Sequence, residues 1–176
     1  MRQNASTINN HDAKRERTVK AMFRKMRRFK QQLDESECAE ILRKEPRGVL
    51  ALLGDDGYPY ALPLDFVYRD GKLYFHCAAE GHKIDAIRRC DKASFCVTEA
   101  GELAPGQWWR VVRSVIAFGR VRILENREEI LSHVRALGLK YAPPDYVESE
   151  LQKDGQRVQC LEFTIEHMTG KRVNEK

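Results

Sequence analysis

The chain has 176 residues, of which 42% are hydrophobic and 9% aromatic, as expected for one globular domain with a core of its own. No run of 18 apolar residues occurs and the basic N-terminus lacks the apolar segment of a secretory signal, so neither a membrane span nor export is predicted. The five cysteines are odd in number and none has CxxC spacing, which disfavours a disulfide framework or a thiolate zinc site and favours reduced thiols in the cytoplasm.

Positive charge is concentrated at the N-terminus. Residues 1–31 hold ten Lys/Arg and two Asp/Glu, a net of +8, whereas residues 32–176 hold twenty-one and twenty-four, a net of −3. We predict a basic arm over 1–25, either solvated or embracing a second subunit, and a folded domain over 26–176. Because that domain offers no general basic surface, a nucleic-acid partner is disfavoured, although the arm alone could tether RNA.

Helices are expected at the start of the chain. Apolar residues at helical spacing predict a short amphipathic helix through Met22, Met26 and Phe29. Asp34 and Glu37 have the spacing of a capping box for a helix over about 35–44, which Pro46 ends.

A β-rich section follows. Strands are predicted over 48–53, 60–68, 73–77, 92–98, 108–124 and 157–167. Residues 54–57 and 69–72 have the composition of hairpin turns. The segment 108–124 reads either as a strand pair or as one strand bent at Gly119. Pro63 cannot donate a hydrogen bond to a ladder, so its strand needs a sheet edge or a bulge.

Three further helices are predicted: 82–89, a segment capped by Asn126 that runs to about Leu139 and stops at Gly138, and about 143–152. Mostly hairpin-connected strands with helices outside them favour a mainly β fold with peripheral helices. The specific expectation is a six-stranded antiparallel split β-barrel, closed or partly closed.

The stretch 73–89 is a candidate phosphate site. It reads as a strand, a tight Glu-Gly loop and a helix that opens with His82 and Lys83. The first amides of a helix are unpaired and its dipole favours an anion there, and Lys83 adds a full positive charge. The alternative is an ordinary strand-to-helix connection with a solvated lysine.

The order of these segments resembles the FMN-binding split-barrel proteins related to pyridoxamine 5′-phosphate oxidase, and among them most closely the nitroimidazole-resistance (Nim) branch. The resemblance covers about 26–172. Its most specific pieces are Gly-Tyr-Pro-Tyr-Ala-Leu-Pro-Leu at 57–64, Leu-Tyr-Phe-His at 73–76, Gly-His-Lys at 81–83 and Met-Thr-Gly-Lys at 168–171.

The resemblance implies a homodimer that holds FMN in grooves between its subunits. It implies ten cofactor-binding residues: Leu62, Pro63, Leu64, Asp65, His76, Cys77, His82, Lys83, Arg113 and Ser114. By this account 62–65 runs along the flavin ring, 76–77 lies by the ribityl chain or phosphate, 82–83 grips the phosphate, and 113–114 comes from the other subunit.

The implied activity is a flavin-dependent reductase or oxidase of a small aromatic or heteroaromatic substrate such as a nitroimidazole, with no catalytic residue identified. The alternative is a non-catalytic flavin or haem carrier, or a stress protein, with His76 as the haem ligand. Cys77 falls on an apolar strand face, which favours packing. No metal site is expected, and no P-loop, because the required upstream glycine is replaced by Ile165.

Overall fold

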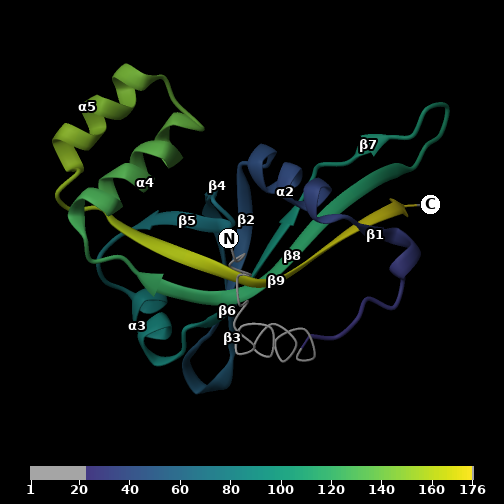
Figure 1. The fold of residues 1–176 in the computed structure, drawn as a ribbon, viewed down its shortest axis with the longest axis horizontal. Helices are drawn as coiled ribbons and strands as arrows, with labels where there is room; N and C mark the ends of the chain where they lie inside the picture. The colour runs from purple at the N-terminus through teal and green to yellow at the C-terminus, as the bar shows by residue number, and fades with distance from the viewer. Residues whose placement is uncertain (1–22, 176) are drawn as a thin grey trace, which may run out of the picture.

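The structure, a computed structural model, describes residues 23–175 and contains one strongly curled antiparallel sheet (Figure 1). Its strands are β1 (Gln32–Leu33), β2 (Arg47–Leu53), β3 (Pro59–Asp65), β4 (Val67–Arg69), β5 (Lys72–Cys77), β6 (Lys92–Thr98), β7 (Glu102–Leu103), β8 (Arg110–Ile123) and β9 (Gln159–Glu175). The strand order is β3-β2-β6-β8-β9-β5-β4, with β1 added to β9 and β7 added to β8. The expected mainly β split barrel is confirmed, with nine strands in place of six.

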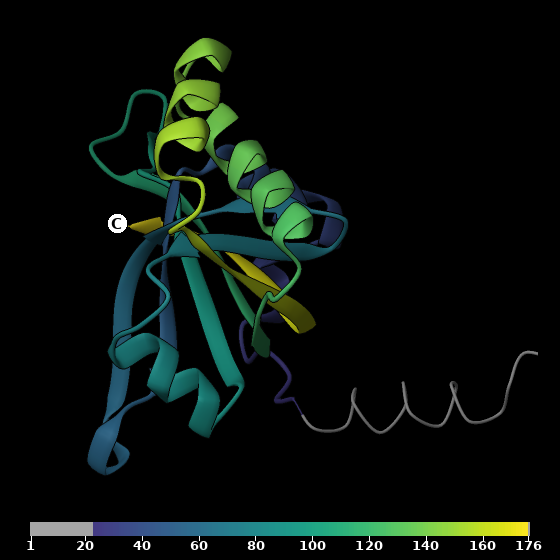
Figure 2. The ribbon, with the colours of Figure 1, turned by 90° about the vertical axis from the view of Figure 1, so that its left-hand side faces the viewer.

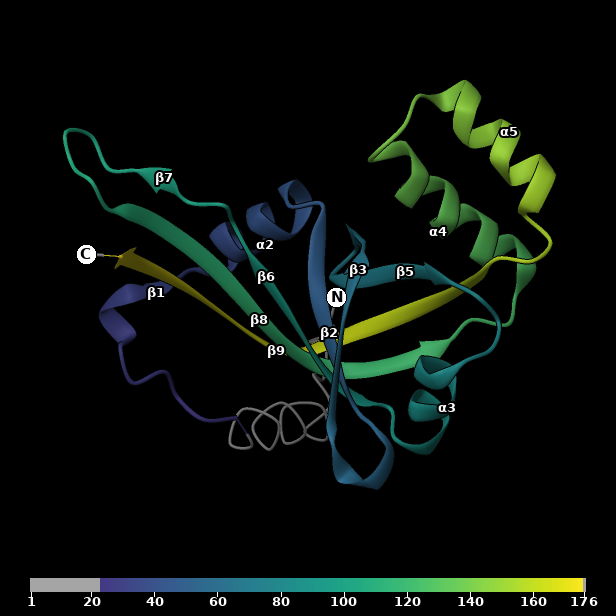
Figure 3. The ribbon, with the colours of Figure 1, turned by 180° about the vertical axis from the view of Figure 1, so that it is seen from behind.

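Helices surround this sheet. They are α2 (Glu35–Lys44), α3 (His82–Arg89), α4 (Arg127–Leu139) and α5 (Pro144–Asp154), with 3₁₀ turns η1 (Phe29–Gln31) and η2 (Asp55–Gly57). Figures 2 and 3 show α4 and α5 as a pair beside the β5 end of the sheet, while α3 lies apart from them. The predicted helix over 82–89 is confirmed at both ends.

The capping box at the start of α2 is confirmed. The Glu37 amide donates to the Asp34 carboxylate at 2.8 Å, and the Asp34 amide donates to Glu37 Oε2 at 2.9 Å. This pairing satisfies amides that the first turn leaves without partners. The buried side of α2 includes Cys38, Ile41 and Leu42.

The predicted helix through Met26 and Phe29 is wrong for the part that the structure describes, since Met22 and most of the basic arm lie outside it. Residues 23–28 form no helix, and Phe29 is 69% exposed in the short turn η1. Phe23 instead stacks on the His167 ring of β9 with ring centroids 4.6 Å apart. With no buried surface for Met26 and Phe29 to share, helical spacing alone did not produce a helix.

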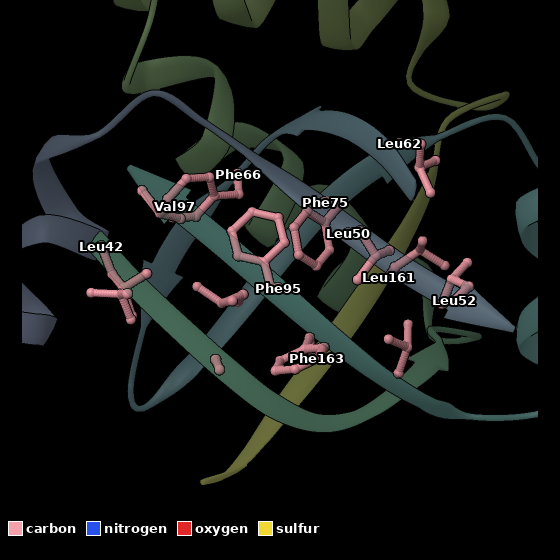
Figure 4. Packing of buried hydrophobic residues seen from close by; sticks show 14 of the residues in the cluster. Leu42, Leu50, Leu52, Leu62, Phe66, Phe75, Phe95, Val97, Leu161 and Phe163 are labelled. Atoms are coloured by element: carbon pink, nitrogen blue, oxygen red, sulfur yellow. The ribbon is translucent and has the colours of Figure 1, made fainter. Parts of the chain in front are cut away.

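Phenylalanines fill the centre of the barrel (Figure 4). The Phe95 ring of β6 lies edge-on to the Phe66 ring, with ring centroids 4.9 Å apart. It is tilted against the Phe75 ring of β5, with centroids 5.1 Å apart. All three rings are at most 1% exposed. The core thus joins strands from both ends of the sheet, which holds it curled.

The chain crosses from one end of the sheet to the other at Phe66. The predicted single strand over 60–68 is wrong: β3 ends before Phe66 and β4 begins after it, at the opposite sheet edge. The Lys140 ammonium holds this crossing by donating to the carbonyls of Phe66 (3.1 Å) and Glu45 (2.5 Å). Tyr141 adds hydrogen bonds to the same carbonyl and to that of Pro46.

The long segment at 108–124 is one bent strand, the second of the two predicted alternatives. The register of the β8–β9 pair shifts between Phe118 and Gly119, where Glu166 of β9 is the extra residue. A Cβ at position 119 would lie 1.9 Å from the Thr164 carbonyl oxygen, so only glycine fits. Strand β9 continues to Glu175 beside β8, well past the predicted end at His167. The bulge shifts the alternation of the pair, which hides this continuation in the sequence pattern.

The predicted helix from the Asn126 cap to about Leu139 is confirmed, and Gly138 lies inside it. A Cβ at position 138 would lie 2.9 Å from Val147 Cγ1 of α5. The glycine therefore lets the two helices approach closely. The predicted hairpin turn at 69–72 is confirmed, with Asp70 and Gly71 at φ values of 50° and 76°, as a type I′ turn requires.

Candidate functional site

A cavity of about 420 Å³ lies where β3, the end of β5 and the start of α3 meet. The side chains that line it are Arg47, Pro63, Leu64, Asp65, His76, Cys77, Ala78 and Lys83. Six of the ten residues that the sequence resemblance implied for the cofactor are in this set. Two pieces of chain that are distant in sequence, 63–65 and 76–83, thus form one site.

The β3 wall of the cavity is a sheet edge. Among the described strands β3 pairs only with β2, so the backbone groups on its other side are free to bind a ligand. Pro63 lies in this strand, and the expectation that it needs an edge is confirmed. Leu62 points into the core at 8% exposure, so only its backbone is available to the cavity.

The β5 wall presents His76 and Cys77 on opposite faces of the strand. The Cys77 side chain is buried, and this burial raises the pKa of its thiol, while Lys83 acts in the opposite direction. A raised pKa keeps the thiol protonated at neutral pH, so it is a poor nucleophile. His76 is exposed, whereas Tyr74 on the same face is covered by α4 and stacks on His133 at 3.6 Å.

From α3 the cavity is lined by Lys83, the second residue of the helix. Gly81 precedes the helix with a φ of 113°, and the amides of Ile84 and Asp85 both donate to its carbonyl, at 2.9 and 3.2 Å. No side chain caps this first turn, and within residues 23–175 no carboxylate forms an ion pair with Lys83. An uncapped helix start beside a lysine without a counterion has the chemistry of an anion site.

His82 is directed elsewhere. Its ring stacks on Tyr60 of β3 at 4.1 Å, and its Nε2 lies 3.4 Å from the Asp55 carboxylate. Asp55 also accepts from Arg89 at 2.5 Å. The His82 side chain therefore attaches α3 to the β2–β3 hairpin and does not line the cavity.

Arg113 and Ser114 do not line this cavity within the same chain. The Arg113 guanidinium donates twice to the Glu99 carboxylate, at 2.8 and 2.7 Å, and faces α2 beside a second cavity of about 270 Å³. Ser114 follows it in β8 and therefore points to the opposite face of the sheet.

Arg47 is a lining residue that the sequence interpretation missed. Its Nε lies 2.7 Å from Asp65 Oδ1, and the two residues are directly opposite in the β2–β3 ladder. The sequence did not reveal this pairing. A four-residue turn at 54–57 would place Arg47 opposite Leu64, whereas the observed five-residue connection, 54–58, places it opposite Asp65.

An exposed apolar face borders the cavity. On the outer side of the sheet Val49, Leu53, Ile116 and Phe118 are 38–50% exposed. Pro63 pairs with Val49, Val49 with Cys96, and Cys96 with Ile116, so one continuous row leads from the cavity across four strands. Exposed large apolar side chains that gather in this way are typical of an interface.

The family model for pyridoxamine 5′-phosphate oxidase matches residues 34–172, which include every cavity residue. The chain belongs to the pyridoxamine 5′-phosphate oxidase family. No curated protein sequence matches the chain. The family resemblance stated from the sequence is therefore confirmed.

Solved structures share the fold. A candidate 5-nitroimidazole antibiotic resistance protein from Bacteroides thetaiotaomicron is 20% identical, with a TM-score of 0.69 over 82% of this chain and 87% of that one. A FAD-binding protein from Mesorhizobium loti is 25% identical, with a TM-score of 0.58 over 81% and 97%. A FAD- and haem-binding protein from Mycobacterium smegmatis is 20% identical, with a TM-score of 0.66 over 80% and 72%.

Among residues 23–175, no helix has the length and apolar character of a membrane span. In the same part of the chain no group of three or more His, Cys, Asp or Glu side chains is placed to hold a metal ion. All five cysteines are free thiols.

Proposed function

We propose that this protein is a flavin-dependent oxidoreductase that binds FMN in the cavity between β3, β5 and α3. The observation that carries the proposal is the joining of an open strand edge to an uncapped helix start in one cavity. Membership of a flavoprotein family and the flavin-binding relatives of the same fold support it.

The residues present fit a flavin mononucleotide. A phosphate would accept from the first amides of α3 and from Lys83. The ribityl chain would pass His76 and Cys77, and the free backbone edge at 62–65 would face the polar side of the ring. When bound, the flavin supplies the electron-transfer chemistry, while the protein orients it and sets its electrostatic surroundings.

A homodimer would complete the site. If the exposed faces that contain Val49 and Ile116 pack together about an axis parallel to the strands, the β3 edge of one subunit meets the β8–β9 side of the other. Ser114 lies on that side and on the correct face. Arg113, held by Glu99 behind the strand, would position Ser114.

The substrate class that we propose is a small heteroaromatic compound, such as a nitroimidazole, that stacks on the exposed side of the ring. The support is the fold shared with a candidate 5-nitroimidazole resistance protein. Free thiols throughout the chain suit a reducing cytoplasm, where a reduced nicotinamide donor is present.

Titration of the protein with FMN tests this function, followed by its visible spectrum. We expect quenching of flavin fluorescence and a flavin absorption band. Turnover of a nitroimidazole with a reduced nicotinamide donor then separates an enzyme from a carrier. A haem Soret band that disappears on substitution of His76 would instead support the haem-carrier alternative, and a protein that binds no flavin would refute the proposal.

A further inference from the structure

The Arg47 guanidinium is only partly used by the protein. Its side chain is 67% exposed, and its Nε contacts Asp65 Oδ1 at 2.7 Å. For the described residues no acceptor is found for its two terminal nitrogens. Asp65 thus holds the group by one edge and leaves the fork of donors available to the cavity that both residues line.

Arg47 lies at one end of β3, and the helix that carries Lys83 is attached near the other end, although both cations line the same cavity. The first residue of α3, His82, stacks on Tyr60 near the start of that strand. Asp65 and Arg47 are at its other end. Tyr60 and Asp65 are five positions apart in extended chain, a distance of about 17 Å. The segment 62–64 runs between the two ends.

This arrangement fixes which end of a flavin each cation would meet. The inference rests on the proposed function, in which Lys83 and the start of α3 hold the phosphate. The ring would then lie further along β3, where Arg47 would be the cation available to its pyrimidine edge. Reduction of the ring by two electrons and one proton leaves one negative charge, which is spread over that edge. A cation there stabilises the reduced form more than the oxidised form.

We infer that Arg47 sets the reduction potential of the bound flavin, raising it, and that Asp65 positions the guanidinium and partly offsets its charge. Arg47 is not among the residues that the family resemblance supplied. The inference is independent of the substrate, because it concerns the charge state of the ring alone.

The test measures the midpoint potential of the FMN-loaded protein, with dithionite as reductant and a reference dye. Arg47→Gln should reduce the preference for reduced over oxidised FMN about tenfold, which for two electrons lowers the potential by about 30 mV. Asp65→Asn removes the opposing charge and should raise the potential. Arg47→Lys keeps the charge and should fall between wild type and Arg47→Gln. Arg88→Gln, which alters an exposed arginine on α3 outside the cavity lining, is the control and should change nothing.

The opposite signs make the test decisive. An unchanged potential in Arg47→Gln, or shifts of the same sign in Arg47→Gln and Asp65→Asn, would overturn the inference while leaving flavin binding intact. If Arg47→Gln fails to retain FMN, Asp65→Asn alone tests the inference. A raised midpoint potential in that variant supports it, and an unchanged or lowered potential overturns it. If wild-type protein binds no flavin, the proposed function itself is refuted.

Discussion

Glu162 of β9 is a buried carboxylate that should make the stability of the fold strongly dependent on pH. Its side chain is 3% exposed, and its carboxylate accepts two hydrogen bonds from the Arg122 guanidinium, at 2.7 and 3.1 Å. The Lys72 ammonium forms an ion pair with it at 3.1 Å, and the Tyr74 hydroxyl donates to it at 3.2 Å. The hydrogen bonds from Arg122 are the main cause that lowers its pKa from 4.5 to about 2. The difference corresponds to about 3 kcal/mol of stability.

The direction of the pH dependence follows from the lowered pKa of Glu162. A carboxylate with a depressed folded-state pKa stabilises the protein above its unfolded-state pKa, and this contribution is lost as pH falls from about 4.5 towards 2. Between pH 7 and pH 3 the loss should be about 2 kcal/mol. Glu162→Gln cannot titrate, so its deficit relative to wild type should be about 3 kcal/mol at pH 7 and clearly smaller at pH 3.

Urea unfolding of both proteins at several pH values measures this difference. Glu148→Gln, which breaks the exposed pair with Arg135, is the control and should show little change at any pH. A deficit for Glu162→Gln that is the same at pH 7 and pH 3 would refute the electrostatic reasoning.

Two further substitutions test the fold and the interface. Gly119→Ala places a Cβ against the Thr164 carbonyl at the bulge of the β8–β9 pair, and we expect a loss of more than about 3 kcal/mol in urea unfolding; a normal midpoint would show that the bulge relaxes easily. Ile116→Asp puts a charge in the exposed apolar face, and we expect a dimer to become a monomer by light scattering with the monomer still folded. A wild-type monomer, or an unaffected dimer, would show that this face is not the interface.

Local patterns predicted the parts of the fold that are set by near neighbours. Cys77 was expected on an apolar strand face, and it is buried there with Leu73 and Phe75. The capping chemistry of Asp34 gave the start of α2. The helix 82–89 was bounded correctly because a glycine and a change of periodicity enclose it.

Contacts between distant segments could not be predicted. The alternation from Tyr60 to Tyr68 continues without a break, yet the chain leaves the sheet at Phe66, because Lys140 and Tyr141, far along the chain, hold that crossing. The bulge in the β8–β9 pair likewise hid the length of β9.

For the candidate site, the two chain segments were foreseen but not all of the directions in which their side chains point. Lys83 lines the cavity, whereas the adjacent His82 is held by Asp55 and Tyr60, a contact that depends on how α3 packs. Arg47 was missed because nothing in its local sequence marks it, although its partner Asp65 had been included.

Binding of FMN compared with riboflavin tests the central claim most directly. Wild-type protein should bind FMN more tightly than riboflavin, and Lys83→Ala should weaken FMN binding about ten- to a hundredfold while leaving riboflavin binding nearly unchanged. Lys44→Ala, which removes an exposed lysine of α2 away from the cavity, should bind both ligands as wild type does. Equal FMN affinity in wild type and Lys83→Ala would contradict a phosphate site at the start of α3.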